Sequence, residues 1–159
     1  MPVLYVIDNT VLSNYMRIGR PELLERAVVP NGVITPAVKE EMELGETLGI
    51  LPPLNWQWLP VTTLDAVEEG LANEFRRRLG PGEAECLAVA VNRKGIIVTD
   101  DRGARQQAIA RGVKTSGTIG ILRMLVDVGH ISLPKADEHL KAMIGEGYHS
   151  PVRSLKHLR

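Results

Sequence analysis

The feature that most constrains this chain is an alternation of short apolar runs with segments of helical pattern. The runs at 3–7 (VLYVI), 32–36 (GVITP), 96–99 (IIVT) and 113–115 (VKT) have the pattern of buried strands, and 56–61 (WQWLPV) is predicted as a further strand or edge segment. Buried runs rich in β-branched residues, separated by helical segments and without hairpin dipeptides, are typical of a parallel sheet covered by helices. The sequence therefore predicts an α/β fold with three layers, α/β/α, around a central parallel sheet.

Between these runs, apolar residues recur at helical spacing, and Thr, Pro and Gly mark the helix ends. Helices are predicted at 10–18, 21–27, 35–45, 63–79, 80–95, 100–112, 116–129 and 133–145. The helix at 80–95 is almost wholly apolar, so we expect it to be central and buried. We predict one domain over 1–147 and a basic, loosely held C-terminal tail over 148–159.

Composition excludes some classes of protein. The 19 basic and 19 acidic residues cancel, so no global positive field indicates a nucleic-acid partner, although a local basic patch is allowed. Cys86 is the one cysteine and lies in an apolar run, so we expect it in the core. The lack of a disulfide partner fits a reducing compartment, and no apolar span approaches the ~20 residues that cross a membrane. We therefore expect a cytoplasmic protein without a membrane partner.

Carboxylates follow two of the predicted strands directly, and others lie near the starts of two helices. In an open parallel sheet, functional groups gather beyond the carboxyl ends of the strands. Each acid taken alone has a structural alternative, because Asp-Asn is a turn signal, Asp caps helices and Glu favours a first helical turn. Taken together, four distant segments each place one or two acids at an element boundary: Asp8, Glu40 with Glu41, Glu83 with Glu85, and Asp100 with Asp101.

Acids gathered at one sheet edge indicate a site for a hard divalent cation. Close carboxylates resist joint ionisation, and Mg²⁺ or Mn²⁺ with oxygen ligands relieves that conflict. Such a site can activate water for attack on a phosphodiester. Zinc is not expected, because Cys86 stands alone and no two histidines have metal-ligand spacing: His130, His139, His149 and His157.

Five segments in order, DNT, TPAVKEEM, GPGEAECLAVAV, IIVTDDRGARQQA and KTSGTIGIL, resemble the PIN-domain ribonucleases. The branch they resemble comprises predicted nucleic-acid-binding PIN proteins related to VapC-type toxins. The resemblance spans Val3 to Gly147, and GEAE and TDDRG with the later GTIGIL are its most specific parts. It implies a PIN-like nuclease domain, Mg²⁺ or Mn²⁺ as cofactor, RNA as substrate, an antitoxin protein as partner, and a homodimer.

The resemblance also implies the site residues. Asp8 matches the first catalytic acid and metal ligand, with Thr10 as the neighbouring hydroxyl in substrate binding. The second acid matches Glu41, with Glu40 as the fallback.

The third acid falls in GEAE, where Glu83 and Glu85 stay equal as catalytic candidates and Glu85 is also assigned to the metal. TDDR gives Asp101 as catalytic acid and metal ligand, with Asp100 close behind as a further metal ligand. Arg102 and Arg105 follow as candidates for holding a phosphate, and a solvated helix face is their alternative.

We predict a metal-dependent endoribonuclease that hydrolyses RNA phosphodiester bonds, as the toxin of a toxin–antitoxin pair. Two departures from the family keep alternatives open. Many relatives have aspartate where this chain offers Glu83 or Glu85, and the hydroxyl of Thr10 is displaced by one residue. The first alternative is a catalytically weak PIN-fold module that binds RNA or protein. The second, a phosphatase with an aspartyl-phosphate intermediate, is disfavoured because Thr10 occupies the place of its second acid.

Overall fold

The computed structural model describes residues 3–156; residues 1–2 and 157–159, which include His157, lie outside the described part. The sheet contains β1 (Tyr5–Ile7), β2 (Gly32–Val33), β3 (Ile96–Val98) and β4 (Lys114–Ser116). All neighbouring strands are parallel, in the order β2-β1-β3-β4. In the central pair, Val6 lies beside Ile97. The predicted parallel sheet is confirmed.

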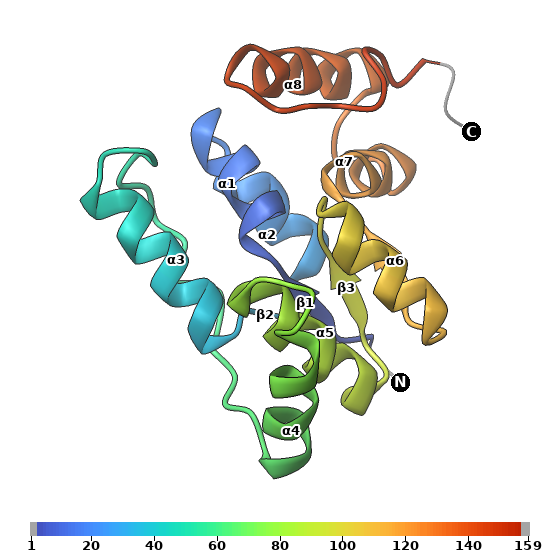
Figure 1. The fold of residues 1–159 in the computed structure, drawn as a ribbon. Helices are drawn as coiled ribbons and strands as arrows, with labels where there is room; N and C mark the ends of the chain where they lie inside the picture. The colour runs from blue at the N-terminus through green and yellow to red at the C-terminus, as the bar shows by residue number, and fades with distance from the viewer. Residues whose placement is uncertain (1–2, 157–159) are drawn as a thin grey trace.

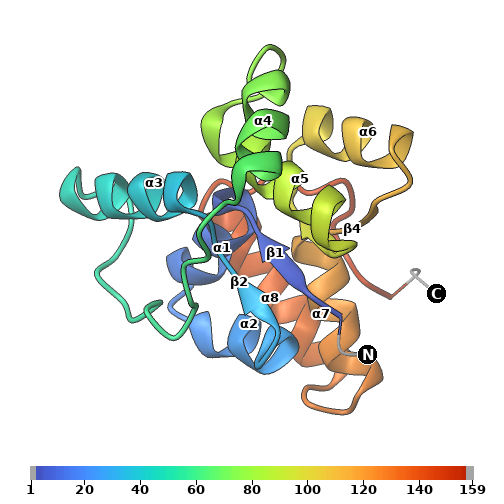
Figure 2. The same cartoon turned by 90° about the horizontal axis from the view of Figure 1, so that it is seen from below.

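Helices cover both faces of this sheet (Figures 1 and 2). On one side lie α4 (Ala66–Phe75), α5 (Pro81–Arg93) and α6 (Arg102–Ala110), and on the other α1 (Asn9–Arg17), α2 (Pro21–Val28), α7 (Thr118–Asp127) and α8 (Leu133–Gly145). The remaining helix, α3 (Pro36–Thr47), packs against α1 and α5. The predicted three-layer α/β arrangement is thereby confirmed. Within residues 3–156, no helix combines the length and the apolar character that a membrane crossing needs.

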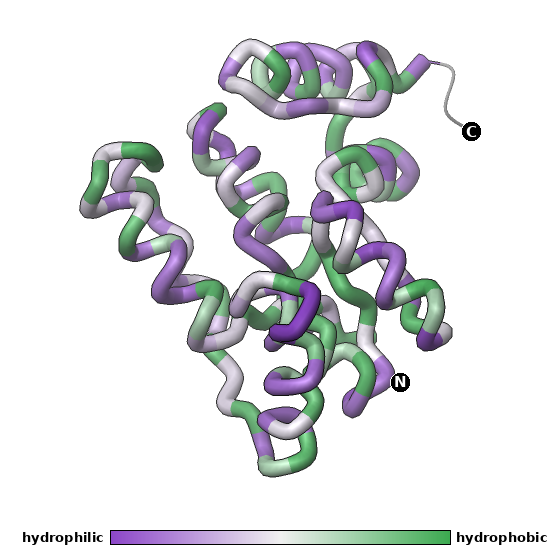
Figure 3. Tube along the Cα trace, in the orientation of Figure 1, coloured by the Kyte–Doolittle hydropathy of each residue, from purple (hydrophilic) through white to green (hydrophobic). Residues whose placement is uncertain are grey.

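The core is centred on α5 and the strands. Residues 84–90 of α5 are all buried, and Cys86 among them is fully buried, as expected. Hydropathy alternates along the outer helix α3, whereas the chain stays apolar along β3 (Figure 3). Because α5 is buried in the core, its first turn, which carries Glu83 and Glu85, is held in a fixed position.

Two predicted elements differ from the structure. The helix predicted at 63–79 is shorter, because Asp65 caps α4 in a capping box with Glu68 and the helix ends at Phe75. Of the two alternatives for 56–61, the strand is wrong, because residues 57–59 form a turn, and the edge segment is confirmed by a single parallel bridge from Val61 to Ile34. Prolines on both sides of the tryptophans limit the backbone donors that a strand needs.

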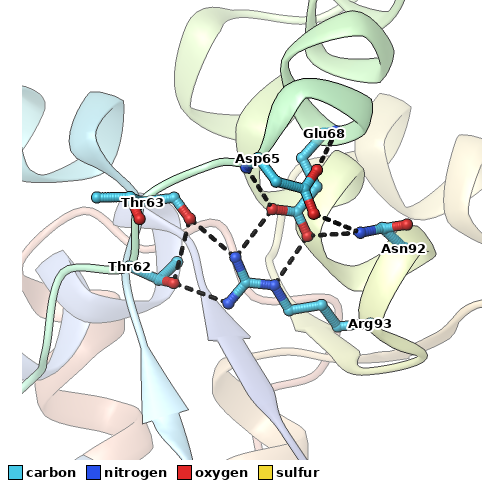
Figure 4. A network of polar contacts seen from close by, with 6 residues as sticks. All are labelled: Thr62, Thr63, Asp65, Glu68, Asn92 and Arg93. Atoms are coloured by element: carbon cyan, nitrogen blue, oxygen red, sulfur yellow. Dashed lines mark hydrogen bonds and ion pairs between the residues drawn. The ribbon is translucent and has the colours of Figure 1, made fainter.

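A partly buried ion pair joins the linker before α4 to the C-terminal end of α5 (Figure 4). Arg93 pairs with the fully buried Glu68 at 2.8 Å and also donates to the Thr62 hydroxyl and the Thr63 carbonyl. Asn92 donates to Glu68 at 3.0 Å. The hydrogen bonds from Arg93 lower the pKa of Glu68 to about 2.

The described part of the predicted tail is packed more firmly than the sequence indicated. Leu155 is buried in the core, and its backbone N–H donates to Asp137 of α8 at 2.6 Å. The Ser154 hydroxyl donates to the same carboxylate at 3.0 Å. Residues 148–156 therefore pack against the domain, with residues 154–155 bound to α8, and residues 157–159 lie outside the described part.

Candidate functional site

The strand order reverses direction between β1 and β3, which makes the crevice beyond their carboxyl ends the expected binding place of this sheet. Asp8 directly follows β1, and Thr99 and Asp100 follow β3. The backbone N–H of Asp8 donates to the Val98 carbonyl at 2.9 Å. Two segments that are distant in sequence therefore meet at this edge, as predicted for neighbouring strands.

Asp8 is buried, with 1% of its surface exposed, and is held by two hydroxyls. Thr10 and Thr99 both donate to its Oδ2, at 2.8 and 2.9 Å. The same hydroxyl oxygens accept from the backbone N–H groups of Asp100 and Asp101, at 3.0 and 3.1 Å. Asp8 occupies the N-cap position of α1 without forming a side-chain cap hydrogen bond. Capping therefore does not account for the burial of this carboxylate.

Burial raises the pKa of Asp8 to about 6, and the negative charge of Glu83 adds to the rise. The hydrogen bonds from Thr10 and Thr99 oppose it. A buried carboxylate that is costly to ionise and is positioned by two hydroxyls is a candidate functional group.

Glu41 faces Asp8 from α3, which begins at Pro36 after the Thr35 cap. Burial, with the charges of Asp8 and Glu83, raises the pKa of Glu41 to about 7. Its Oε1 lies so close to Gly82 that an added Cβ there would be 2.2 Å away. Glu40 is exposed. The structure thus places Glu41, and not Glu40, beside Asp8.

The two glutamates of α5 differ in their surroundings. Glu83 is half-buried and interacts by charge with Asp8 and Glu41. Glu85 is buried, and both of its oxygens are engaged: Oε1 accepts from the Ala37 N–H at 2.9 Å, and Oε2 pairs with Arg76 at 3.0 Å. This geometry favours Glu83 for the site and gives Glu85 a structural task, joining the start of α3 to the end of α4.

Asp100 and Asp101 also differ in the contacts of their side chains. The Asp101 side chain caps α6 by accepting from the Ala104 N–H at 2.8 Å. Asp100 accepts from the Thr118 N–H at 3.0 Å and from the Asn14 amide at 3.3 Å. Burial raises the pKa of Asp100, and the Thr118 hydrogen bonds oppose the rise. The sequence preferred Asp101, whereas the contacts favour Asp100.

Three further polar residues belong to this site and were missed from the sequence: Asn14, Thr99 and Thr118. All three are buried. Asn14 donates to the Thr118 hydroxyl at 3.0 Å as well as to Asp100, and the Thr118 hydroxyl also donates to Asp100. The available signals were the Thr in the TDDRG and GTIGIL motifs, and an Asn on the buried face of the first helix.

The arginines that follow Asp101 lie next to the site. Arg105 donates to the Thr99 carbonyl at 3.1 Å, and its charge lowers the pKa of Asp100 against the effect of burial. Arg102 is exposed on the first turn of α6. Both arginines line one cleft together with Asp100.

The oxygen donors of this edge fit a hard divalent cation by their chemistry. Asn9 supports this: it donates to Glu41 at 3.3 Å, and its Oδ1 is the one buried side-chain N or O atom in residues 3–156 without a hydrogen-bond partner. In that same part of the chain, no three His, Cys, Asp or Glu side chains converge closely enough to hold a metal ion. The oxygen donors therefore suit a divalent cation in their chemistry, but their side chains do not converge on one point in this structure.

Known proteins share the fold and a sequence pattern with this chain. A family model described as a PIN domain matches residues 4–158. The crystal structure of PAE2754 from Pyrobaculum aerophilum aligns with a TM-score of 0.54 at 16% identity, over 79% of this chain and 92% of that chain. That similarity shows the fold. No curated protein sequence matches the chain.

Proposed function

This chain belongs to the PIN-domain family, a family of nucleases, and from that premise we propose that it is an endoribonuclease that hydrolyses RNA phosphodiester bonds with Mg²⁺ or Mn²⁺. The observation that carries the proposal is Asp8, a buried carboxylate whose side chain forms no cap hydrogen bond with α1 and is fixed by two threonine hydroxyls. Burying a carboxylate is costly unless a partner stabilises its charge. A bound divalent cation is such a partner, and the cation would in turn hold the phosphodiester.

The proposed metal ligands are Asp8, Glu83 and Asp100, with Glu41 completing the acidic cluster. When bound, the divalent cation would neutralise the phosphate and promote deprotonation of the attacking water. Thr10 and Thr99 hold Asp8 in one orientation, and Asn14 with Thr118 does the same for Asp100. Arg105 places a positive charge beside Asp100, where a substrate phosphate would need one.

The test is cleavage of a fluorescently labelled single-stranded RNA by the purified chain with Mn²⁺. Asp8→Asn should lower the rate at least ~100-fold, because positioned charge at a reaction centre is worth that much, while the far-UV circular dichroism stays native. The matched control is Asp127→Asn, at the exposed end of α7, which should cleave like the wild type. Undiminished cleavage by Asp8→Asn, with contaminating nuclease excluded, would contradict the mechanism.

A second candidate is a PIN-fold module that binds RNA or protein without efficient hydrolysis. One observation favours it: within residues 3–156 the acids do not close around a metal position. Under this alternative, the wild-type chain and Asp8→Asn would both leave the labelled RNA intact.

The resemblance to VapC-type toxins extends the proposal to a biological role. The chain would act as the toxin of a toxin–antitoxin pair and as a homodimer. A basic segment of the antitoxin would enter the acidic site, and the adjacent gene is where that partner is expected.

A further inference from the structure

A large cleft opens beside Asp100, between α6, the start of α7 and the C-terminal segment that follows α8. Its volume is about 770 Å³, within the range of ~300–1,000 Å³ in which proteins hold small ligands. Figure 2 shows the C-terminal segment running back past β4 towards α6. The cleft is continuous with the acidic site, because Asp100 and Gly117 line it.

The charge in this cleft differs from that of the whole chain, in which acidic and basic residues cancel. Arg102, Arg105 and Arg123 line it, and Asp100 is the one carboxylate among its lining residues. In the described part of the chain, none of the three arginines forms an ion pair. Unpaired guanidinium groups in a concave surface favour an anionic ligand, and they match phosphate geometry especially well.

The lining of the cleft also includes apolar and aromatic side chains. Tyr148, Pro151 and Val152 come from the C-terminal segment, and Ile119 comes from α7. Tyr148 is half-buried, and burial together with the charge of Asp100 raises the pKa of its phenol to about 12. The phenol of Tyr148 therefore lies in the same cleft as Asp100, and its ring is the kind of flat surface on which unpaired bases stack.

We propose that this cleft binds the nucleotide next to the scissile phosphate, with its phosphate on the arginines and its base against Tyr148. The inference rests on the proposed function and gives residues 148–152, outside the predicted nuclease domain, a part in substrate binding. The occupant is a single-stranded RNA, because a base reaches Tyr148 only when it is free of a duplex.

Among the three arginines, Arg105 also donates to the Thr99 carbonyl, whereas Arg123 has no such contact in the described residues. Arg123 has no hydrogen bond or ion pair there, so loss of its charge removes no protein contact of that kind. The lack of a side chain at Gly117 leaves room for Asp100 and Arg105, since an added Cβ would lie 2.4 Å from Asp100 Oδ1 and 3.1 Å from Arg105 Nη1. The backbone thus approaches the acid and the arginine at the point where cleft and acidic site meet.

The test measures binding of a short fluorescein-labelled single-stranded RNA of mixed sequence to the full chain in EDTA, by fluorescence anisotropy over a range of salt. Arg123→Ala should raise the Kd about 10-fold and reduce the salt slope by about one. Tyr148→Ala should raise the Kd at least ~5-fold, because base stacking is lost. Tyr148→Phe, which keeps the ring, should bind within about 2-fold of the wild type.

The matched control is Arg26→Ala, which removes one exposed charge from α2 outside the cleft. Equal Kd values for Arg123→Ala, Tyr148→Ala and Arg26→Ala, or no RNA binding by the wild type, would overturn the proposal. Thermal melting checks that each variant is folded. If Tyr148→Ala fails to fold, the Kd of Arg123→Ala alone tests the proposal. The Arg123 side chain has no ion-pair or hydrogen-bond partner in residues 3–156, so its removal should leave the fold intact.

Binding and cleavage separate the two proposals. If the wild type cleaves RNA with Mn²⁺ while the cleft variants bind like Arg26→Ala, the cleft proposal fails and the nuclease stands. If the wild type does not cleave but the cleft variants lose binding, the cleft is supported and the nuclease fails.

Discussion

At the scale of single residues, the site consists of acids that the fold keeps costly to ionise. Asp8 and Glu41 have pKa values of about 6 and about 7, mainly because of burial. The charge of Asp8 also raises the pKa of Glu41, and the charge of Glu83 raises the pKa of both. A molecule retains such a cluster at the expense of stability, which is typical of functional sites.

This predicts how stability depends on pH. A carboxylate whose pKa is raised from 3.8 to about 6 stays protonated up to a higher pH in the folded state than in the unfolded state. Its contribution to stability therefore falls as pH rises from about 4 to about 6 and is constant above that range. Two pKa units correspond to about 3 kcal/mol.

Urea denaturation of the metal-free protein at pH 4 and pH 7.5 measures this effect. The difference in unfolding free energy between wild type and Asp8→Asn should shift by about 2–3 kcal/mol in favour of the variant at the higher pH. A difference that is the same at both pH values would show that Asp8 is not destabilised by its surroundings.

At the scale of elements, α5 positions the acids through a glycine. A Cβ at Gly82 would lie 2.2 Å from Glu41 Oε1, and this contact is with the end of a flexible side chain. Gly82→Ala should therefore change the unfolding free energy by less than about 1 kcal/mol. It should lower RNA cleavage about 10- to 100-fold by displacing Glu41.

The matched control for Gly82→Ala is Gly70→Ala in α4, where an added Cβ meets no atom within 4 Å. Cleavage rates and denaturation curves of both variants show whether Gly82→Ala lowers activity without lowering stability. Equal activity of the two variants would show that the position of Glu41 is unimportant.

The element scale also includes the ion pair of Glu68 with Arg93, which joins α4, α5 and the linker before α4 (Figure 4). Arg93→Met keeps the aliphatic stem and leaves a buried carboxylate unpaired, so the unfolding free energy at pH 7 should fall by about 3 kcal/mol.

The low pKa of Glu68 stabilises the wild type above about pH 4.5, and this contribution is lost as pH falls towards 2. The loss caused by Arg93→Met should therefore be smaller at pH 4 than at pH 7 when both are measured by urea denaturation. A loss below about 1 kcal/mol at pH 7 would contradict this role of the pair.

At the scale of the whole molecule, the sequence predicts the scaffold better than the site. Short β-branched runs and capped helices are local signals, and they gave the four parallel strands and the order of helices. The strand predicted around the two tryptophans failed because flanking prolines and a turn outweighed its apolar pattern.

The choice between neighbouring acids depends on contacts that no local pattern contains. Whether Asp100 or Asp101 faces the site is decided by which of them caps α6. The role of Glu85 depends on Arg76 and on the start of α3. Thr99 and Asn14 become site residues only through contacts with segments far away along the chain.

The most direct test of this account is calorimetric titration of the wild-type chain with Mn²⁺ at pH 6.5 in two buffers of different ionisation heat. We expect saturable binding below the millimolar range with release of protons, because acids with pKa values of about 6 and 7 must ionise. Binding to Asp8→Asn should be weaker by at least about 10-fold. No binding up to millimolar Mn²⁺, or equal binding by the variant, would contradict the account.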